Sequence, residues 1–176
     1  MAPIFRSLIL SLCLCGLLAA SGELSNRPAP DFRLPDSKGR TVGLSDFKGK
    51  VLLIEFMSTT CPHCQKFAPV LEDVHTRFKG RVAVVGIATF PDSASTVAEF
   101  IQTYKTSYPI LLDPSRTAAM NYLKPPPPNF SFSIPHVFLV DPAGYIRDDF
   151  VQNPSNGDLF TSEGLRRLVG GYLPRR

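Results

Sequence analysis

Apolar residues gather in short runs along the chain, and three of these runs have the length of a buried β-strand. Residues 51–57 are apolar at every position except Glu55, which is the pattern of a strand covered on both faces. Residues 82–88 form a second run of this kind, and residues 108–112 form a shorter third one. We therefore expect a β-sheet at the centre of the molecule, with Glu55 as an unusual charged residue inside it.

Two further apolar segments near the C-terminus predict a β-hairpin. Residues 137–140 and 145–150 flank residues 141–144, whose Asp, Pro, Ala and Gly are typical of a turn. A helix should follow the hairpin, because apolar residues then recur at helical spacing, at Leu165, Leu168 and Val169.

Helical periodicity is clearest directly after Cys64. The helix should end at Gly80, a residue that commonly terminates helices. Pro69 falls inside the helix and should kink it, because proline lacks a backbone donor and its ring crowds the preceding turn. The apolar positions of this helix are Phe67, Val70, Leu71, Val74 and Phe78.

Two shorter helices are predicted between the strands. Thr96 and Glu99 have the spacing of a capping box at the start of a helix. Asp113 and Pro114 predict the start of another helix, with the aspartate as its cap and the proline in its first turn, ending near Tyr122.

Strands and helices thus alternate along the chain, which predicts an α/β fold with a sheet flanked by helices. With 176 residues, 44% of them hydrophobic, the chain has the size of one domain, which we place at residues 26–173. Residues 26–50 are rich in proline and glycine and predict turns and short edge strands that pack as an N-terminal hairpin.

The first 22 residues have the features of a secretory signal peptide. Arg6 precedes an apolar run over residues 8–20, and small residues follow it. This run is shorter than the ~20 residues that span a bilayer, which favours cleavage over an uncleaved membrane anchor. We therefore expect an exported protein, periplasmic or otherwise extracytoplasmic, and interpret Cys13 and Cys15 as apolar filler of the segment.

Charge and low-complexity features add little to this interpretation. The formal net charge is +4, but the basic residues are scattered rather than clustered in a stripe, so the chain does not resemble a nucleic-acid-binding protein. Four consecutive prolines, Pro125 to Pro128, predict a polyproline II segment in a surface loop.

Removal of the signal peptide would leave two cysteines, Cys61 and Cys64, separated by Pro62 and His63. A pair with this spacing, at the junction of a strand and a helix, is suited to reversible disulfide formation. The unpaired N–H groups and the dipole at the helix N-terminus favour the thiolate of Cys61, and a proton on His63 would act in the same direction. We predict Cys61 as the nucleophile and Cys64 as the resolving thiol.

Two other interpretations of the pair stay open from the residues alone. One is a purely structural disulfide. The other is half of a zinc site, which would need two further ligands from His75, His136 or carboxylates. Because the spacing fits disulfide exchange better than either, we predict no bound metal ion.

These residues resemble those of the thioredoxin superfamily, in the same order along the chain: Glu55, the cysteine pair, the helix-kinking Pro69, and Ile134 with Pro135 before a strand. Residues 28–32, 49–56 and 135–141 resemble more narrowly the TlpA-like thiol-disulfide reductases, which are related to the alkyl hydroperoxide reductase superfamily. The resemblance covers residues 27–150. It implies a thioredoxin-like fold, with a central mixed sheet and an N-terminal β-hairpin extension.

The resemblance also implies roles for individual residues. Pro135 would be a cis proline facing the cysteines and, with Ile134, would bind the substrate backbone. Glu55 would be a buried carboxylate with a raised pKa that relays a proton to or from Cys64, whereas an exposed carboxylate at a sheet edge is the alternative. Met57 and Thr60 stand where many relatives have aromatic residues, so substrate docking should differ.

The resemblance implies protein thiols or disulfides as substrates, a membrane redox partner, and no cofactor besides the redox-active Cys61–Cys64 disulfide. The dipeptide of Pro62 and His63 is also that of the DsbA-type oxidases, which leaves the direction of electron flow open. His136 is either a scaffold residue or a ligand near the sulfurs.

Two other functions on the same fold are alternatives. A peroxiredoxin would match at Ser58, three residues before Cys61, but it would need a proline where Ile54 stands. A Sco-like copper chaperone would bind Cu(I) through two thiolates and a histidine, but that family has three residues between its cysteines.

Overall fold

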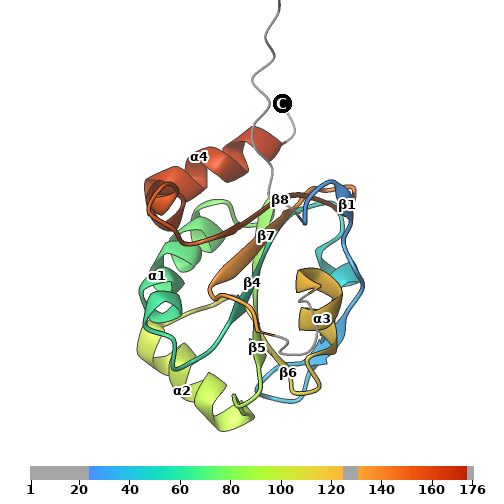
Figure 1. Cartoon of the computed structure of the whole chain (residues 1–176), viewed down its shortest axis with the longest axis vertical. Helices are drawn as coiled ribbons and strands as arrows, with labels where there is room; N and C mark the ends of the chain where they lie inside the picture. The colour runs from blue at the N-terminus through green and yellow to red at the C-terminus, as the bar shows by residue number, and fades with distance from the viewer. Residues whose placement is uncertain (1–23, 125–130, 174–176) are drawn as a thin grey trace, which may run out of the picture.

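The computed structural model describes residues 24–124 and 131–173, and its main feature is a six-stranded mixed β-sheet with helices on both faces (Figure 1). The strand order is β1-β8-β7-β4-β5-β6. These strands are β1 (Arg27–Pro28), β8 (Tyr145–Val151), β7 (His136–Val140), β4 (Val51–Met57), β5 (Val82–Thr89) and β6 (Ile110–Asp113).

The strand β4 lies at the centre of the sheet, as its apolar sequence predicts. All seven of its residues are buried, because packed cores cover both faces of the sheet at this strand. At its two edges, β5 pairs with it in parallel and β7 pairs with it antiparallel. The strands β5 and β6 continue in parallel, whereas β7, β8 and β1 are antiparallel. This arrangement confirms the α/β fold class and the predicted hairpin of β7 and β8.

Residues alternate between two cores along the strands. Leu53 of β4 and Val137 of β7 face a core covered by α1 (Pro62–Arg77), α2 (Ala94–Tyr104) and α4 (Ser162–Tyr172). Leu52 and Phe138 face the opposite core, which α3 (Thr117–Leu123) covers together with the N-terminal segment. Figure 1 shows α1, α2 and α4 on one side of the sheet and α3 on the other.

The N-terminal segment contains more structure than a single hairpin. The strands β2 (Arg33–Pro35) and β3 (Thr41–Gly43) form the predicted antiparallel hairpin, and the short 3-10 helix η1 (Leu44–Phe47) follows. Before them, β1 pairs with β8 at the edge of the main sheet. The segment therefore joins both the sheet and the core beneath α3.

The helix α1 starts where the sequence predicts and runs to Arg77. Cys61 is its N-cap, Pro62 is at its first position, and Pro69 lies inside it on an exposed surface. The chain then turns at Gly80, whose φ of +84° is the left-handed conformation that glycine adopts without steric cost. A second 3-10 helix, η2 (Gly157–Phe160), precedes α4.

Both predicted helix caps between the strands are wrong. The cap of α2 is Ser93, whose hydroxyl accepts from the Thr96 backbone N–H and whose own N–H donates to the Thr96 hydroxyl. The cap thus lies three residues before Thr96, and Glu99 lies beyond the capping interaction. Ser93 can take the N-cap position in place of Thr96 because serine caps helices at least as well as threonine does.

The predicted cap of α3 is displaced for a different reason. Asp113 ends the buried strand β6, and from there its carboxylate accepts the backbone N–H of Ala119 (2.9 Å) inside the helix. The helix itself starts at Thr117, after Arg116 in a left-handed conformation, so Pro114 lies in the preceding turn rather than in the helix.

Several sequence predictions fall outside the residues that the structure describes, namely the signal peptide over residues 1–22, with Cys13 and Cys15, and the prolines Pro125 to Pro128. Within residues 24–124 and 131–173, no helix is long and apolar enough to cross a membrane.

Candidate active site

Cys61 and Cys64 lie one helical turn apart at the start of α1, and they differ in exposure. Cys61 is partly exposed, and its sulfur accepts the backbone N–H of Cys64 (3.5 Å) as the N-cap interaction of the helix. Cys64 is fully buried in the core beneath α1. Both are free thiols. An accessible sulfur at a helix N-terminus is suited to nucleophilic attack, and a buried one beside it is suited to a second, internal attack.

The segment before β7 lies against the first cysteine. The thiol of Cys61 donates to the carbonyl oxygen of Ile134 (3.9 Å), and the Ile134–Pro135 peptide bond is cis. Both Cys61 and Ile134 pack against the core beneath α1. The fold therefore brings Ile134, and with it the following Pro135, next to the partly exposed thiol, although Ile134 and Cys61 are 73 positions apart in the sequence.

Glu55 is buried in the centre of the sheet, where it is paired with Gly86 of β5 and Val137 of β7, and only 1% of its surface is exposed. The alternative of an exposed carboxylate at a sheet edge is therefore wrong. Burial raises the pKa of Glu55 well above its usual range, and the nearby Cys61 adds to this effect. Its Oε1 atom has no hydrogen-bond partner among the described residues.

The pKa of Cys64 is raised for related reasons. Burial is the main cause, and the negative charge of Glu55 is the next. The two groups therefore lie close enough for the charge on Glu55 to oppose ionisation of the thiol. A buried thiol with a raised pKa needs a base close by, and a carboxylate made more basic by the same burial is suited to accept its proton.

Tyr108, for which the sequence predicts only a place in a strand, belongs to the same buried region. Burial raises its pKa, and the charges of Glu55, Glu72 and Cys64 contribute in the same direction. Its hydroxyl has no hydrogen-bond partner in the described part of the chain, and its ring packs edge-on against His75. The aromatic ring of a tyrosine favours burial, but the sequence does not indicate where its hydroxyl lies.

Pro62 and His63 lie in the exposed first turn of α1. The His63 ring Nδ1 lies 2.8 Å from Oε1 of Gln152, so it donates to that oxygen when it carries the proton. Gln152 follows the end of β8. This contact therefore joins the active-site helix to the far end of the hairpin and fixes the orientation of the His63 ring.

The loop before Cys61 is held by a carboxylate that no sequence motif indicates. Asp92 accepts hydrogen bonds from the backbone N–H of Thr59 (3.2 Å) and from the hydroxyl of the same residue. The side chain of Gln65 donates to the Thr59 carbonyl oxygen (2.8 Å). Thr59 is thus bonded both to the loop before α2 and to α1, which fixes the approach of the chain to Cys61.

His136 lies away from the sulfurs, on the other face of the sheet. Its Nε2 pairs with Asp149 (3.2 Å), and its ring stacks on Phe138. Burial opposes ionisation of Asp149, but hydrogen bonds from His136, Ser25 and the Leu24 N–H outweigh that effect and lower its pKa. His136 is therefore a scaffold residue that pairs with Asp149 of β8, and the Asp149 carboxylate in turn fastens the N-terminal segment to that strand.

The possibility of a zinc site gains no support from this geometry. His136 faces away from the cysteines, and within the described residues no group of three or more His, Cys, Asp and Glu side chains could hold a metal ion.

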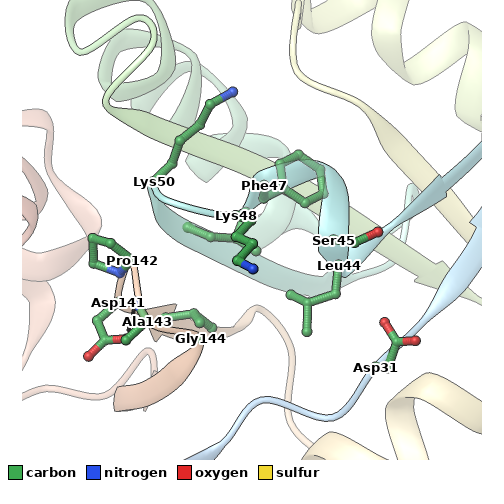
Figure 2. A pocket seen from close by; sticks show the side chains of 12 residues that line it. Asp31, Leu44, Ser45, Phe47, Lys48, Lys50, Asp141, Pro142, Ala143 and Gly144 are labelled. Atoms are coloured by element: carbon green, nitrogen blue, oxygen red, sulfur yellow. Dashed lines mark hydrogen bonds between the residues drawn. The ribbon is translucent and has the colours of Figure 1, made fainter.

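A cavity of about 420 Å³ lies at the opposite end of the sheet (Figure 2). It is separate from the cysteines, because Lys50 and Leu52 line it at the beginning of β4, whereas Cys61 follows the end of that strand. Its other lining residues include Leu44, Phe47, Val140 and Pro142.

Comparison with known proteins shows that this chain is similar to redox proteins. Residues 25–149 match the model of the AhpC/TSA family. The chain is 30% identical over 118 residues to the thiol-disulfide oxidoreductase ResA of Bacillus subtilis, a match that covers 67% of this chain and 62% of ResA. It is 30% identical over 130 residues to the thioredoxin-like protein YneN of the same organism, covering 72% of this chain and 71% of YneN.

A solved structure also resembles this chain. It is a putative protein disulfide isomerase from Bacteroides thetaiotaomicron, with a TM-score of 0.67 and 26% sequence identity, covering 82% of this chain and 85% of that protein. The alignment with ResA spans less than two thirds of the length of that relative. These likenesses confirm the predicted thioredoxin-like fold.

Proposed function

This chain belongs to the AhpC/TSA family. On that premise we propose that it is a thiol-disulfide oxidoreductase of the thioredoxin superfamily, as its similarity to ResA and YneN supports. We propose further that it is an exported, TlpA-like reductase of protein disulfides that acts through Cys61 and Cys64. The observation that carries the proposal is the difference between the two sulfurs. Cys61 is accessible at the N-cap of α1, and Cys64 is buried one turn behind it.

The proposed reaction has two exchange steps. The Cys61 thiolate attacks one sulfur of a substrate disulfide, which forms a mixed disulfide and releases the other substrate sulfur as a thiolate. Cys64 then loses its proton and attacks the Sγ of Cys61, which forms the Cys61–Cys64 disulfide and releases the second substrate thiolate. Two electrons pass to the substrate, the two released thiolates take up protons, and the enzyme pair becomes oxidised.

Glu55 is the proposed proton acceptor in the second step. Burial raises the pKa of Cys64, so this thiol needs a base before it can attack. The pKa of Glu55 is itself raised by burial, which makes its carboxylate a stronger base than an exposed one. The electrostatic effect of Glu55 on Cys64 supports the assignment, since it requires the two groups to lie near each other.

The substrate backbone is proposed to bind beside Ile134 and Pro135. The carbonyl oxygen of Ile134 lies next to the Cys61 sulfur, so a polypeptide joined to Cys61 would pass this segment. Pro62 and His63 are exposed next to the sulfur in the sequence. The hydrogen bond from His63 to Gln152 supports a fixed orientation of the imidazole there.

Export and a redox partner complete the proposal. The apolar segment over residues 8–20 supports secretion, and residues 26–173 are proposed to be the functional domain outside the cytoplasm. In such an oxidising compartment the cysteine pair would become reduced again only if a membrane thiol-disulfide partner supplied electrons. The chemistry that we propose uses no group besides the Cys61–Cys64 disulfide.

Reduction of insulin disulfides by the reduced protein tests the proposal. With dithiothreitol added to reduce the Cys61–Cys64 disulfide after each cycle, we expect turnover with the wild type, loss of turnover in Cys61→Ser, and arrest after one covalent step in Cys64→Ser. Copper titration and peroxide consumption, measured on the same preparation, distinguish the copper-chaperone and peroxidase alternatives. Peroxide consumption without insulin reduction would contradict the proposed function.

A further inference from the structure

A second cavity, of about 400 Å³, lies between the helix α2 and the loop that leads into Cys61, and its lining includes Thr60, the residue before the proposed nucleophile. This volume is within the range of ~300–1,000 Å³ that is common for small-molecule pockets. In Figure 1, α1 and α2 are neighbouring helices on the same side of the sheet. The residues that line the cavity include Thr59, Thr60, Gln65, Glu99, Thr103 and Tyr104.

The position of the cavity places it within reach of a bound substrate. Thr60 is exposed and immediately precedes Cys61, and Gln65 lies in the first turns of α1. We therefore expect a polypeptide joined to Cys61 by a disulfide to have a residue within reach of the opening. One of its side chains can then enter the cavity while the disulfide is being exchanged.

The lining of the cavity is polar, and the charge that it carries is negative. Glu99 is an exposed carboxylate, and it makes no hydrogen bond or ion pair with another residue in the described part of the chain. Asp92, which binds Thr59, adds a second carboxylate close by. Lys66 and Lys105 are sequence neighbours of lining residues, but neither lines the cavity.

The other lining groups suit the stem of a long basic side chain. The threonine hydroxyls can accept or donate hydrogen bonds, and the Gln65 amide already bonds to Thr59 within the wall. The ring of Tyr104 packs against that of the buried Phe100, with 4.5 Å between the ring centres, which fixes an aromatic ring at this end of the cavity. Aromatic faces attract cations, as carboxylates do.

We propose that this cavity is a specificity subsite that binds a lysine or arginine side chain close to the reacting cysteine of a protein substrate, with Glu99 as the residue that selects the positive charge. The inference rests on the proposed disulfide exchange at Cys61 and names a class of substrate for it, namely polypeptides with a basic residue near the disulfide.

The test uses three synthetic peptides with the same internal disulfide, which differ only in carrying Lys, Gln or Glu two residues from the attacked cysteine. The rate of their reduction by the full-length reduced protein is measured in rapid mixing. We expect the order Lys, Gln, Glu with steps of about two- to fivefold, the size given by an exposed ion pair, and a weaker order in high salt.

Two variants test whether this order of rates depends on the cavity. In Glu99→Gln the rate for the Lys peptide should fall to that for the Gln peptide, and Thr103→Trp, which fills the cavity from an exposed helix position, should remove the same preference. Glu163→Gln is the matched control, since it removes one carboxylate from α4, at the other end of the molecule from α2 (Figure 1), and should keep the full order.

The outcomes of these experiments separate the subsite from the function on which it rests. Equal rates for the three peptides, or a lysine preference that persists in Glu99→Gln, overturn the subsite while the exchange activity stands. Failure of the wild-type protein to reduce any of the peptides overturns the proposed function, and the subsite with it.

Discussion

Replacement of Glu55 by glutamine should make the protein more stable at neutral pH and slower in disulfide exchange. Glutamine has the shape of the protonated carboxyl group but cannot ionise. In the wild type, the buried carboxyl has a raised pKa, so the folded state holds the proton more tightly than the unfolded chain does. The contribution of Glu55 to stability is therefore fully present below the unfolded pKa and is lost as the pH rises through the folded pKa.

The size of the effect follows from proton linkage. Above the unfolded glutamate pKa of about 4.3, the free energy of unfolding of the wild type should fall relative to Glu55→Gln by up to about 1.4 kcal/mol per pH unit. The difference should stop growing when the pH passes the pKa of Glu55 in the folded protein. Other titrating groups are common to both proteins and cancel in the comparison.

Urea unfolding of the reduced wild type and Glu55→Gln, followed by circular dichroism from pH 4.5 to 7.5, measures this difference. Glu163→Gln, which removes an exposed carboxylate from α4, controls for the change in net charge. Insulin reduction by the same samples measures the exchange rate, which should fall in Glu55→Gln if the carboxylate accepts the proton of Cys64.

Two results would refute this reasoning. A stability difference that does not change with pH would show that the carboxyl is not held neutral by burial. An unchanged exchange rate in Glu55→Gln, with the pH-dependent stability difference present, would show that the residue is buried but takes no part in proton transfer.

Two further predictions follow from the same structure. In the folded, reduced protein, iodoacetamide should modify Cys61 and leave the fully buried Cys64 unmodified until urea is added, as peptide mass mapping would show; equal labelling of both thiols would contradict the assigned roles. Asp149→Ala should lower the free energy of unfolding by about 1–3 kcal/mol at pH 7, because it removes the acceptor for His136, Ser25 and the Leu24 N–H. Since the Asp149 pKa is lowered in the folded protein, its contribution is present above the unfolded pKa of about 3.9 and lost as the pH falls through the folded pKa, so urea unfolding should show a smaller loss in acid.

Local sequence patterns predict the parts of the fold that depend on local physics. The apolar run of β4 requires burial on both faces, and its single charged residue, Glu55, can be recognised as a buried acid for the same reason. Pro62 and the periodic apolar positions after Cys64 predict the start and the buried face of α1. The cysteine spacing then places both sulfurs at that helix start without any knowledge of tertiary contacts.

The features that local patterns miss depend on contacts between distant residues. Thr59 and Asp92 are 33 residues apart, and neither has a local pattern that predicts their hydrogen bonds. Glu99 fits the spacing of a capping box, but Ser93 caps α2 and leaves Glu99 available to line the cavity beside Cys61. A residue that fits a local motif can thus have its role decided by a competing residue and by the neighbouring elements.

The assignment of Cys61 as the attacking thiol and Cys64 as the resolving thiol is central to the proposed function. The most direct measurement is mass spectrometry of the full chain carrying Cys64→Ser after incubation with a disulfide-bonded protein, with Cys61→Ser treated in the same way. We expect a mixed disulfide between Cys61 and the substrate that accumulates in Cys64→Ser and is absent in Cys61→Ser. Absence of any covalent species in Cys64→Ser, or equal amounts in both variants, would contradict the assignment.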